Sequence, residues 1–96
     1  MISASEQEKQ TIRDILRKHV PNSEVRVFGS RHTGNNKNYS DMDMVITGNF
    51  NGDALSALRC EFEESRLPYR IDVLDYRLLS EEFRKVVDSG YTVFPL

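Results

Sequence analysis

Hydrophobic residues near the start of the chain recur at helical spacing. Four of them form one stripe of a helix: Ile12, Ile15, Leu16 and Val20. Ser5, with Glu8 three residues later, fits a capping box that marks the start of this helix. Pro21 ends it, because the residue before a proline is pushed out of the α region.

The next two hydrophobic segments have the composition or alternation typical of β-strands. Val25–Phe28 is a short β-branched and aromatic run that ends at Gly29-Ser30. Three asparagines then predict a loop: Asn35, Asn36 and Asn38. Residues 41–47 alternate, so one face of this strand carries Met42, Met44 and Ile46. The opposite face carries Asp41, Asp43, Val45 and Thr47.

The second half of the chain continues the alternation between helix and strand. Residues 48–52 predict a turn, and Asp53 is expected to cap a helix with a buried stripe of Leu55, Leu58 and Phe62. A strand is predicted over residues 69–75. Ser80 is expected to cap a last helix that points Phe83, Val86 and Val87 inward. Residues 91–94 then predict a closing edge strand.

These elements predict one α+β domain that spans residues 1–96. Helices and strands mix along the chain, so we expect a mixed sheet with the helices packed mainly on one face. A length of 96 residues suits one small domain, and 39% hydrophobic and 29% charged residues are ordinary for a globular protein.

Charge and cysteine content narrow the class of protein. The net charge of -2 gives no basic excess, so we expect no direct, sequence-independent grip on nucleic acid. The single cysteine, Cys60, excludes an intramolecular disulfide and favours a cytoplasmic setting. No apolar run approaches the roughly 18 residues that span a bilayer. We therefore expect neither a membrane segment nor, from the polar N-terminus, a signal peptide.

Three aspartates are the strongest candidates for chemistry. Asp41 and Asp43 point to the same face of their strand, with Cα atoms about 7 Å apart. Asp72 lies on the face of the later strand opposite to Asp75, and it becomes their partner if the two strands are neighbours. Carboxylate oxygens are the ligands that magnesium (Mg2+) prefers, and a divalent ion offsets the repulsion within such a group. Two bridged metals would polarise a phosphate and activate an attacking hydroxyl.

Gly29-Ser30 is the second candidate feature. Glycine lets a backbone approach a ligand closely, and free N–H groups beside a serine hydroxyl can receive phosphate oxygens. Arg31 and Lys37 could add positive charge there. An isolated acidic pair or Gly-Ser turn is far more often a solvated strand start or an ordinary turn. Three further residues suggest no role in chemistry, because His19 and His32 read as surface residues and Cys60 as helix packing.

The combined pattern resembles the nucleotidyltransferase fold of the DNA polymerase β superfamily, above all its minimal nucleotidyltransferase (MNT) antitoxins. The motif is Gly29-Ser30, ten residues, then Asp41-Met42-Asp43. Four surrounding stretches are also similar to the family: "VFGSR", "GNNKNYSDMDMVI", "YRIDVLDY" and "FRKVVDSGYTVF". The chain departs from many relatives at His32-Thr33, where they carry a second basic residue.

The resemblance implies a role for each motif residue. Asp41 and Asp43 would bind catalytic Mg2+, and Asp72 would be the third carboxylate, which helps to prepare the acceptor hydroxyl. Gly29, Ser30 and Arg31 would bind the nucleotide. The reaction would move a nucleoside monophosphate from ATP or another nucleoside triphosphate to a hydroxyl and release pyrophosphate. For MNT–HEPN pairs the resemblance implies the transfer of AMP to a tyrosine of the HEPN toxin.

Three other functions remain open at this stage. A binding-only antitoxin could block its partner by contact, although such a binder has no need of three converging carboxylates. A nucleotidyltransferase could instead use a small-molecule acceptor, or the aspartates could be accidental in a structural domain. Since 96 residues suffice for little beyond a catalytic core, we expect a partner protein to present the acceptor, or the chain to work as a homo-oligomer.

Overall fold

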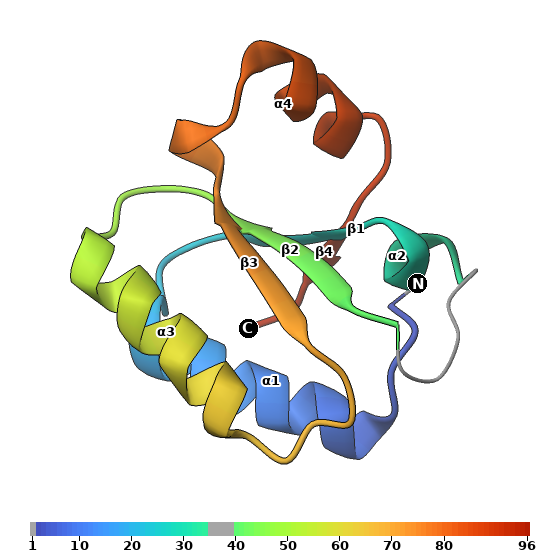
Figure 1. The fold of residues 1–96 in the computed structure, drawn as a ribbon, viewed down its shortest axis with the longest axis vertical. Helices are drawn as coiled ribbons and strands as arrows, with labels where there is room; N and C mark the ends of the chain where they lie inside the picture. The colour runs from blue at the N-terminus through green and yellow to red at the C-terminus, as the bar shows by residue number, and fades with distance from the viewer. Residues whose placement is uncertain (1, 35–39) are drawn as a thin grey trace.

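The computed structural model describes residues 2–34 and 40–96 (Figure 1). It has the predicted order of helices and strands, with a short helix at Ser30–Thr33 and a 3-10 turn at Tyr76–Leu78 in addition. In chain order, the elements are α1 (Glu6–His19), β1 (Val25–Phe28), α2 (Ser30–Thr33), β2 (Met42–Ile46), α3 (Gly52–Glu64), β3 (Ile71–Asp75), the 3-10 turn η1 (Tyr76–Leu78), α4 (Glu81–Asp88) and β4 (Thr92–Phe94). The expected loop at residues 35–38 and Lys37 lie outside the described residues. No described helix is long and apolar enough to cross a membrane.

The strands form one mixed sheet in the order β3-β2-β1-β4. β1 runs antiparallel to both β2 and β4, whereas β2 and β3 run parallel. In this register Phe28 pairs with Asp43, and Asp43 pairs with Asp72. The end of β1 and the starts of β2 and β3 therefore meet at one end of the sheet, which is where the candidate residues cluster.

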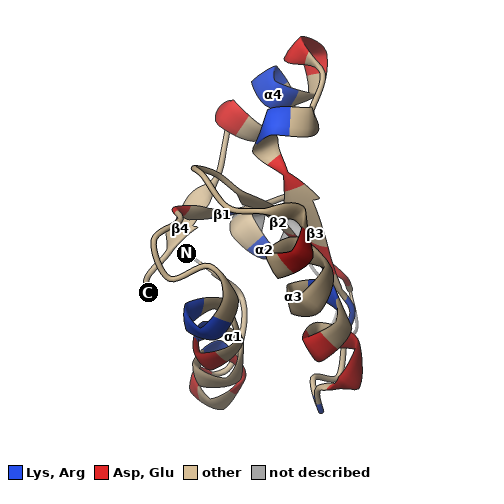
Figure 2. Ribbon diagram, turned by 90° about the vertical axis from the view of Figure 1, so that its left-hand side faces the viewer, with Lys and Arg blue, Asp and Glu red and all other residues tan. Residues whose placement is uncertain are grey.

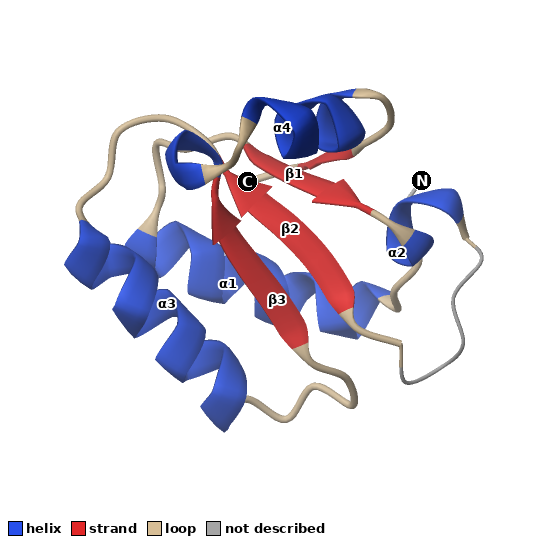
Figure 3. Ribbon diagram, turned by 45° about the horizontal axis from the view of Figure 1, so that its top comes forward, coloured by secondary structure: helices blue, strands red, loops and turns tan. Residues whose placement is uncertain are grey.

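The sheet separates two apolar clusters of unequal size. The two long helices α1 and α3 cover one face, as expected, and α4 lies over the opposite face (Figures 2 and 3). Met42, Met44 and Ile46 point into the larger cluster beneath α1 and α3. Phe28, Val45 and Val87 form the smaller cluster beneath α4. The alternation in β2 thus predicted its two faces correctly, and the larger cluster packs the face beneath α1 and α3.

Two of the three expected helix caps are confirmed. The Ser5 hydroxyl accepts from the backbone N–H of Glu8, whose carboxylate accepts from Ser5 in return. Ser80 accepts from the N–H of Phe83 at the start of α4. The third was wrong, because Asn51 and not Asp53 caps α3. Both residue types cap well, so the sequence alone could not choose between them.

The expected interior of α4 is also wrong in two of its three residues. Val87 is fully buried, but the side chains of Phe83 and Val86 remain 37% and 58% exposed. Helical spacing shows that residues share a stripe but not how far the helix tilts over the sheet. The result is an apolar flank on α4 that the described chain does not cover.

The expectations for the two histidines and the cysteine are wrong as well. His19 on α1 contacts Glu61 on α3 at 2.8 Å, and His32 on α2 contacts Thr92 on β4 at 2.7 Å. Both contacts join elements that are far apart in the sequence, so no local pattern could reveal them. Cys60 is exposed on α3 instead of being packed.

Candidate active site

Asp43 and Asp72 lie side by side at the starts of two parallel strands. Their Cα atoms are partners in the β2–β3 register, so both side chains point to the sheet face that α1 and α3 leave open. Asp41 is exposed just before β2, on the same side of the chain as Asp43 by alternation. The sheet therefore brings Asp43 and Asp72 together, as predicted for neighbouring strands. Asp41 lies directly before the start of β2.

The surroundings of Asp43 raise the pKa of its carboxyl. Burial raises it above the ordinary aspartate value, and the negative charges of Asp72 and then Asp41 raise it further. The negative charges of both other aspartates thus act on the Asp43 carboxyl. A divalent cation is the natural counter-charge for an oxygen-rich group of this kind.

The carboxylates suit a metal chemically but are not yet arranged around one. Among the described residues, no three His, Cys, Asp or Glu side chains are gathered closely enough to hold an ion. The side chain of Asp72 is 47% exposed and lies 3.7 Å from Arg70, which is itself exposed. Such a loose ion pair can yield to a cation at little cost. Metal binding by Asp41, Asp43 and Asp72 stays a prediction.

The Gly29-Ser30 turn lies against the carboxylates. Gly29 has a φ of 77°, and a methyl group in its place would lie 2.8 Å from Oδ2 of Asp43. The absence of a side chain at Gly29 is what lets the turn approach so closely. Ser30 follows as the first residue of α2. The two halves of the predicted site therefore meet, although direct nucleotide contacts of Gly29 and Ser30 stay predictions.

Arg31 is buried, with only 3% of its surface exposed. Its guanidinium donates to the carbonyls of Ser3 and Ser40 at 2.9 and 2.8 Å, and it lies 3.8 Å from the centre of the Tyr69 ring. Ser40 precedes Asp41, and Tyr69 leads into β3. Arg31 thus ties together the segments that deliver the carboxylates, which supports a positioning role; a direct contact with nucleotide stays a prediction.

Tyr69 beneath this guanidinium is itself held in place. Its hydroxyl donates to Glu8 of α1 at 3.1 Å. Burial, and after it the charge of Glu8, raises the pKa of Tyr69 to about 12. The phenol therefore stays neutral at physiological pH and serves as packing for Arg31.

His32 joins α2 to β4, the edge strand on the side of the sheet opposite β3. Beyond its bond to Thr92, its ring lies against Gly90, where a methyl group would come within 3.4 Å of Nε2. The sequence contained no sign of this contact, because the partners are 60 residues apart. The turn that begins at Gly29 is therefore anchored at Arg31 on one side and at His32 on the other.

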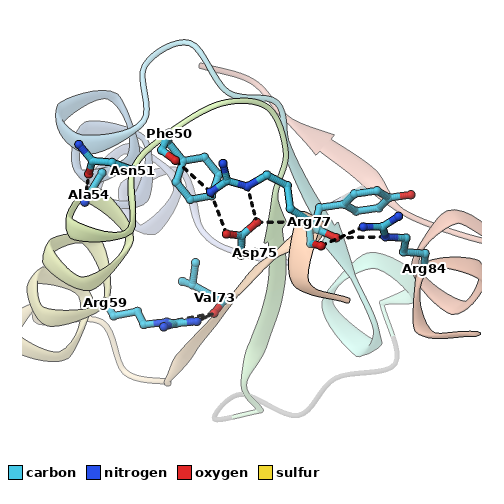
Figure 4. Close-up of polar contacts among 9 residues, drawn as sticks. Phe50, Asn51, Ala54, Arg59, Val73, Asp75, Arg77 and Arg84 are labelled. Carbon is cyan, nitrogen blue, oxygen red and sulfur yellow. Dashed lines mark hydrogen bonds and ion pairs between the residues drawn. The ribbon is translucent and has the colours of Figure 1, made fainter. Parts of the chain in front are cut away.

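Asp75 lies on the opposite face of β3 from Asp72, as predicted, and has a structural role. Its carboxylate is buried and accepts from Arg77 at 2.9 Å, while Arg77 also donates to the carbonyl of Phe50 (Figure 4). The Arg77 hydrogen bond lowers the pKa of Asp75. Farther along the open edge of β3, Arg59 donates to the carbonyl of Val73 at 2.7 Å (Figure 4). Asp75 is thus paired inside the protein, unlike Asp72.

The similarity of this chain to known proteins extends over nearly its whole length. The family model described as "Nucleotidyltransferase domain" matches residues 9–93. This chain belongs to the nucleotidyltransferase family. The family consists of enzymes that transfer nucleotidyl groups, and members of this kind generally use a divalent metal. Among curated proteins, the chain is similar to the "Probable protein adenylyltransferase MntA" of Haemophilus influenzae, with 39% identity over 89 residues that cover 91% of this chain and 78% of the relative.

Several solved structures share the fold of this chain. One is a crystal structure of a toxin–antitoxin with AMP-PNP, with a TM-score of 0.72, 21% identity and coverage of 91% of this chain and 72% of that chain. Another is a tri-AMPylated Shewanella oneidensis HEPN toxin in complex with an MNT antitoxin, with a TM-score of 0.64, 18% identity and coverage of 94% and 71%. Both likenesses support the nucleotidyltransferase fold predicted from the sequence.

Proposed function

We propose that this chain is a Mg2+-dependent nucleotidyltransferase that transfers AMP from ATP to a tyrosine hydroxyl of a HEPN-type toxin and so acts as an antitoxin. The observation that carries the proposal is the pairing of Asp43 with Asp72, with Gly29 packed against Asp43. The similarity to a relative named as a protein adenylyltransferase supports the donor and the kind of acceptor. A complex of an MNT antitoxin with an AMPylated HEPN toxin supports the partner.

The candidate residues would have separate roles in this reaction. Asp41, Asp43 and Asp72 would hold the metal through carboxylate oxygens, and a bound divalent cation would neutralise phosphate charge as it builds up. The Gly29-Ser30 turn would hold the triphosphate beside these carboxylates. Because Asp72 is half exposed and only loosely paired, it can accept the hydrogen bond of an incoming hydroxyl.

The transfer itself is balanced without a further reactant. The acceptor oxygen attacks the α-phosphorus of ATP, and the bond from that phosphorus to the oxygen of the β-phosphate breaks. Pyrophosphate leaves, and the hydroxyl proton moves to Asp72. The product is AMP joined to the acceptor through a phosphodiester bond.

A labelling experiment tests the proposal. The chain is incubated with magnesium, ATP labelled at the α-phosphate and the HEPN protein encoded beside it, if its genome has one. We expect label on that protein with the wild type and none with Asp41→Asn, Asp43→Asn or Asp72→Asn. Asp53→Asn is the matched control, since Asp53 is an exposed aspartate in the first turn of α3, beyond the far end of β2.

Two results would contradict the proposal. Toxin neutralisation without label, and unchanged in the three variants, would make the chain a binding-only antitoxin. Label that appears on a small hydroxyl compound, and not on the protein, would identify a small-molecule acceptor instead.

A further inference from the structure

The helix α4 has two different flanks above the open face of the sheet. On one flank Arg84 donates to the carbonyls of Tyr76 and Arg77 at 3.2 and 3.0 Å, and Asp88 accepts from Arg26 at 3.1 Å. Residues 84 and 88 are four apart and so share this polar flank. This flank faces η1, and the protein's own groups pair with both side chains.

The other flank of α4 is apolar and exposed. Phe83 and Val86 are three residues apart, so they lie on one side of the helix. Their side chains are 37% and 58% exposed, although Val87 beside them is fully buried. Together they form a small apolar surface beside the packed cluster.

This apolar flank borders the candidate active site. The ring of Phe83 meets that of Phe28 edge to face, with centroids 5.9 Å apart and an interplanar angle of 84°. Phe28 is the residue of β1 directly opposite Asp43, so the two side chains are neighbours on the same sheet face. Phe28 therefore links Phe83 to the strand position of the Asp43 carboxylate.

We propose that Phe83, with Val86 beside it, is the platform on which the base of the bound nucleotide stacks. This inference rests on the proposed function and assigns the end of the nucleotide that the motif residues leave unassigned. The triphosphate belongs with Gly29 and Asp43, where the polar groups are, and the base needs an aromatic face close by. On the opposite face of the sheet, the aromatic side chains of Phe62, Tyr69 and Phe94 are buried in the larger cluster.

The chemistry of this platform also predicts a preference among bases. Stacking on an aromatic ring accepts every base, since each has a π-face, and it favours the one with the larger ring area. A purine should therefore bind more tightly than a pyrimidine.

The absence of tryptophan from the sequence makes a direct test possible. Phe83→Trp introduces a single indole, whose fluorescence is followed while ATP or inorganic tripolyphosphate is added with magnesium. We expect saturable quenching by ATP and no quenching by tripolyphosphate, which lacks a base but should compete with ATP. Val93→Trp is the control, since Val93 is 45% exposed on β4 and should report neither compound.

Affinity measurements on three further variants complete the test. Phe83→Leu keeps an apolar contact with Phe28 but has no flat ring, and Phe83→Ala removes both. We expect the dissociation constant for ATP to rise about tenfold in each, with tripolyphosphate binding unchanged. Phe83→Tyr should bind ATP like the wild type.

The opposing results separate this inference from the function it rests on. If the wild type binds ATP and Phe83→Leu and Phe83→Ala bind it equally well, the platform is wrong and the transferase is not. If these variants bind ATP normally but no longer modify the toxin, Phe83 contacts the partner protein, which also overturns the platform. If the wild type binds neither ATP nor tripolyphosphate, the proposed function fails and the platform with it.

Discussion

Gly29 is packed so closely against Asp43 that a methyl group on Gly29 would lie 2.8 Å from Oδ2 of the carboxylate. This contact joins the turn at the end of β1 to the Asp43–Asp72 pair of the parallel strands. The turn therefore needs a glycine for two reasons: the close contact with Asp43 and the φ of 77°. Any side chain there would push the carboxylate away from its place beside Asp72.

We expect Gly29→Ala to abolish nucleotide transfer while costing only about 1–2 kcal/mol of folding stability from the positive φ. Gly34→Ala is the matched control, because Gly34 has a φ of 83° but its methyl group would meet no described atom within 4 Å. Urea unfolding and transfer assays compare the two. Equal losses of activity in both variants would refute the role of the Gly29–Asp43 contact.

Asp43→Asn should make the metal-free protein more stable while removing its activity. The folded state raises the pKa of Asp43, so the folded protein holds this proton more tightly than the unfolded chain does. The ionised carboxylate therefore destabilises the fold at neutral pH, and its cost disappears as the pH falls through the raised pKa. Urea unfolding in EDTA at neutral and mildly acid pH measures this, and an equal or lower stability of Asp43→Asn at neutral pH would contradict it.

Magnesium should reverse the difference in folding stability between the wild type and Asp43→Asn. If the ion binds at Asp43, it lowers the pKa of this carboxyl and stabilises the wild type but not Asp43→Asn. NMR titration of the aspartate carboxyl carbons with and without magnesium follows the shift. Titration curves that ignore magnesium would exclude a metal at this position.

Asp75→Asn should have the opposite effect on stability. The Arg77 hydrogen bond lowers the pKa of the buried Asp75 carboxyl, so the pair stabilises the fold above the ordinary aspartate pKa near 3.9, and this contribution is lost as the pH falls through the lowered value. We expect Asp75→Asn to lose roughly 2 kcal/mol at neutral pH and little in acid. Urea unfolding across pH checks this. Destabilisation that is the same at all pH values would argue against the ion pair as its source.

Arg31→Lys tests whether this arginine positions the site or binds nucleotide directly. Lysine keeps the charge but cannot donate to the Ser3 and Ser40 carbonyls at once as the planar fork does. We expect a loss of about 1–2 kcal/mol in folding stability and a lower kcat, with KM for ATP little changed. A raised KM with unchanged stability would instead make Arg31 a phosphate ligand.

The sequence predicted those parts of the site that depend on local periodicity. Alternation along β2 and β3 predicted that Asp43 and Asp72 come together if the two strands are neighbours, and the strand order of the structure meets that condition. The sequence could not predict the inward turn of Arg31, whose partners come from three distant segments, or the contact between His32 and Thr92. Nor could the sequence choose between Asn51 and Asp53 as the cap of α3, or show that Phe83 stays exposed. Both depend on how the helices pack in the folded protein.

The most direct test of the account is the mass of the intact HEPN partner after incubation with ATP, magnesium and this chain. The account predicts that the partner gains the mass of one or more AMP groups with the wild type and with Asp53→Asn, and none with Asp43→Asn. A partner that is neutralised without any gain in mass, or that gains the same mass with Asp43→Asn, would contradict it.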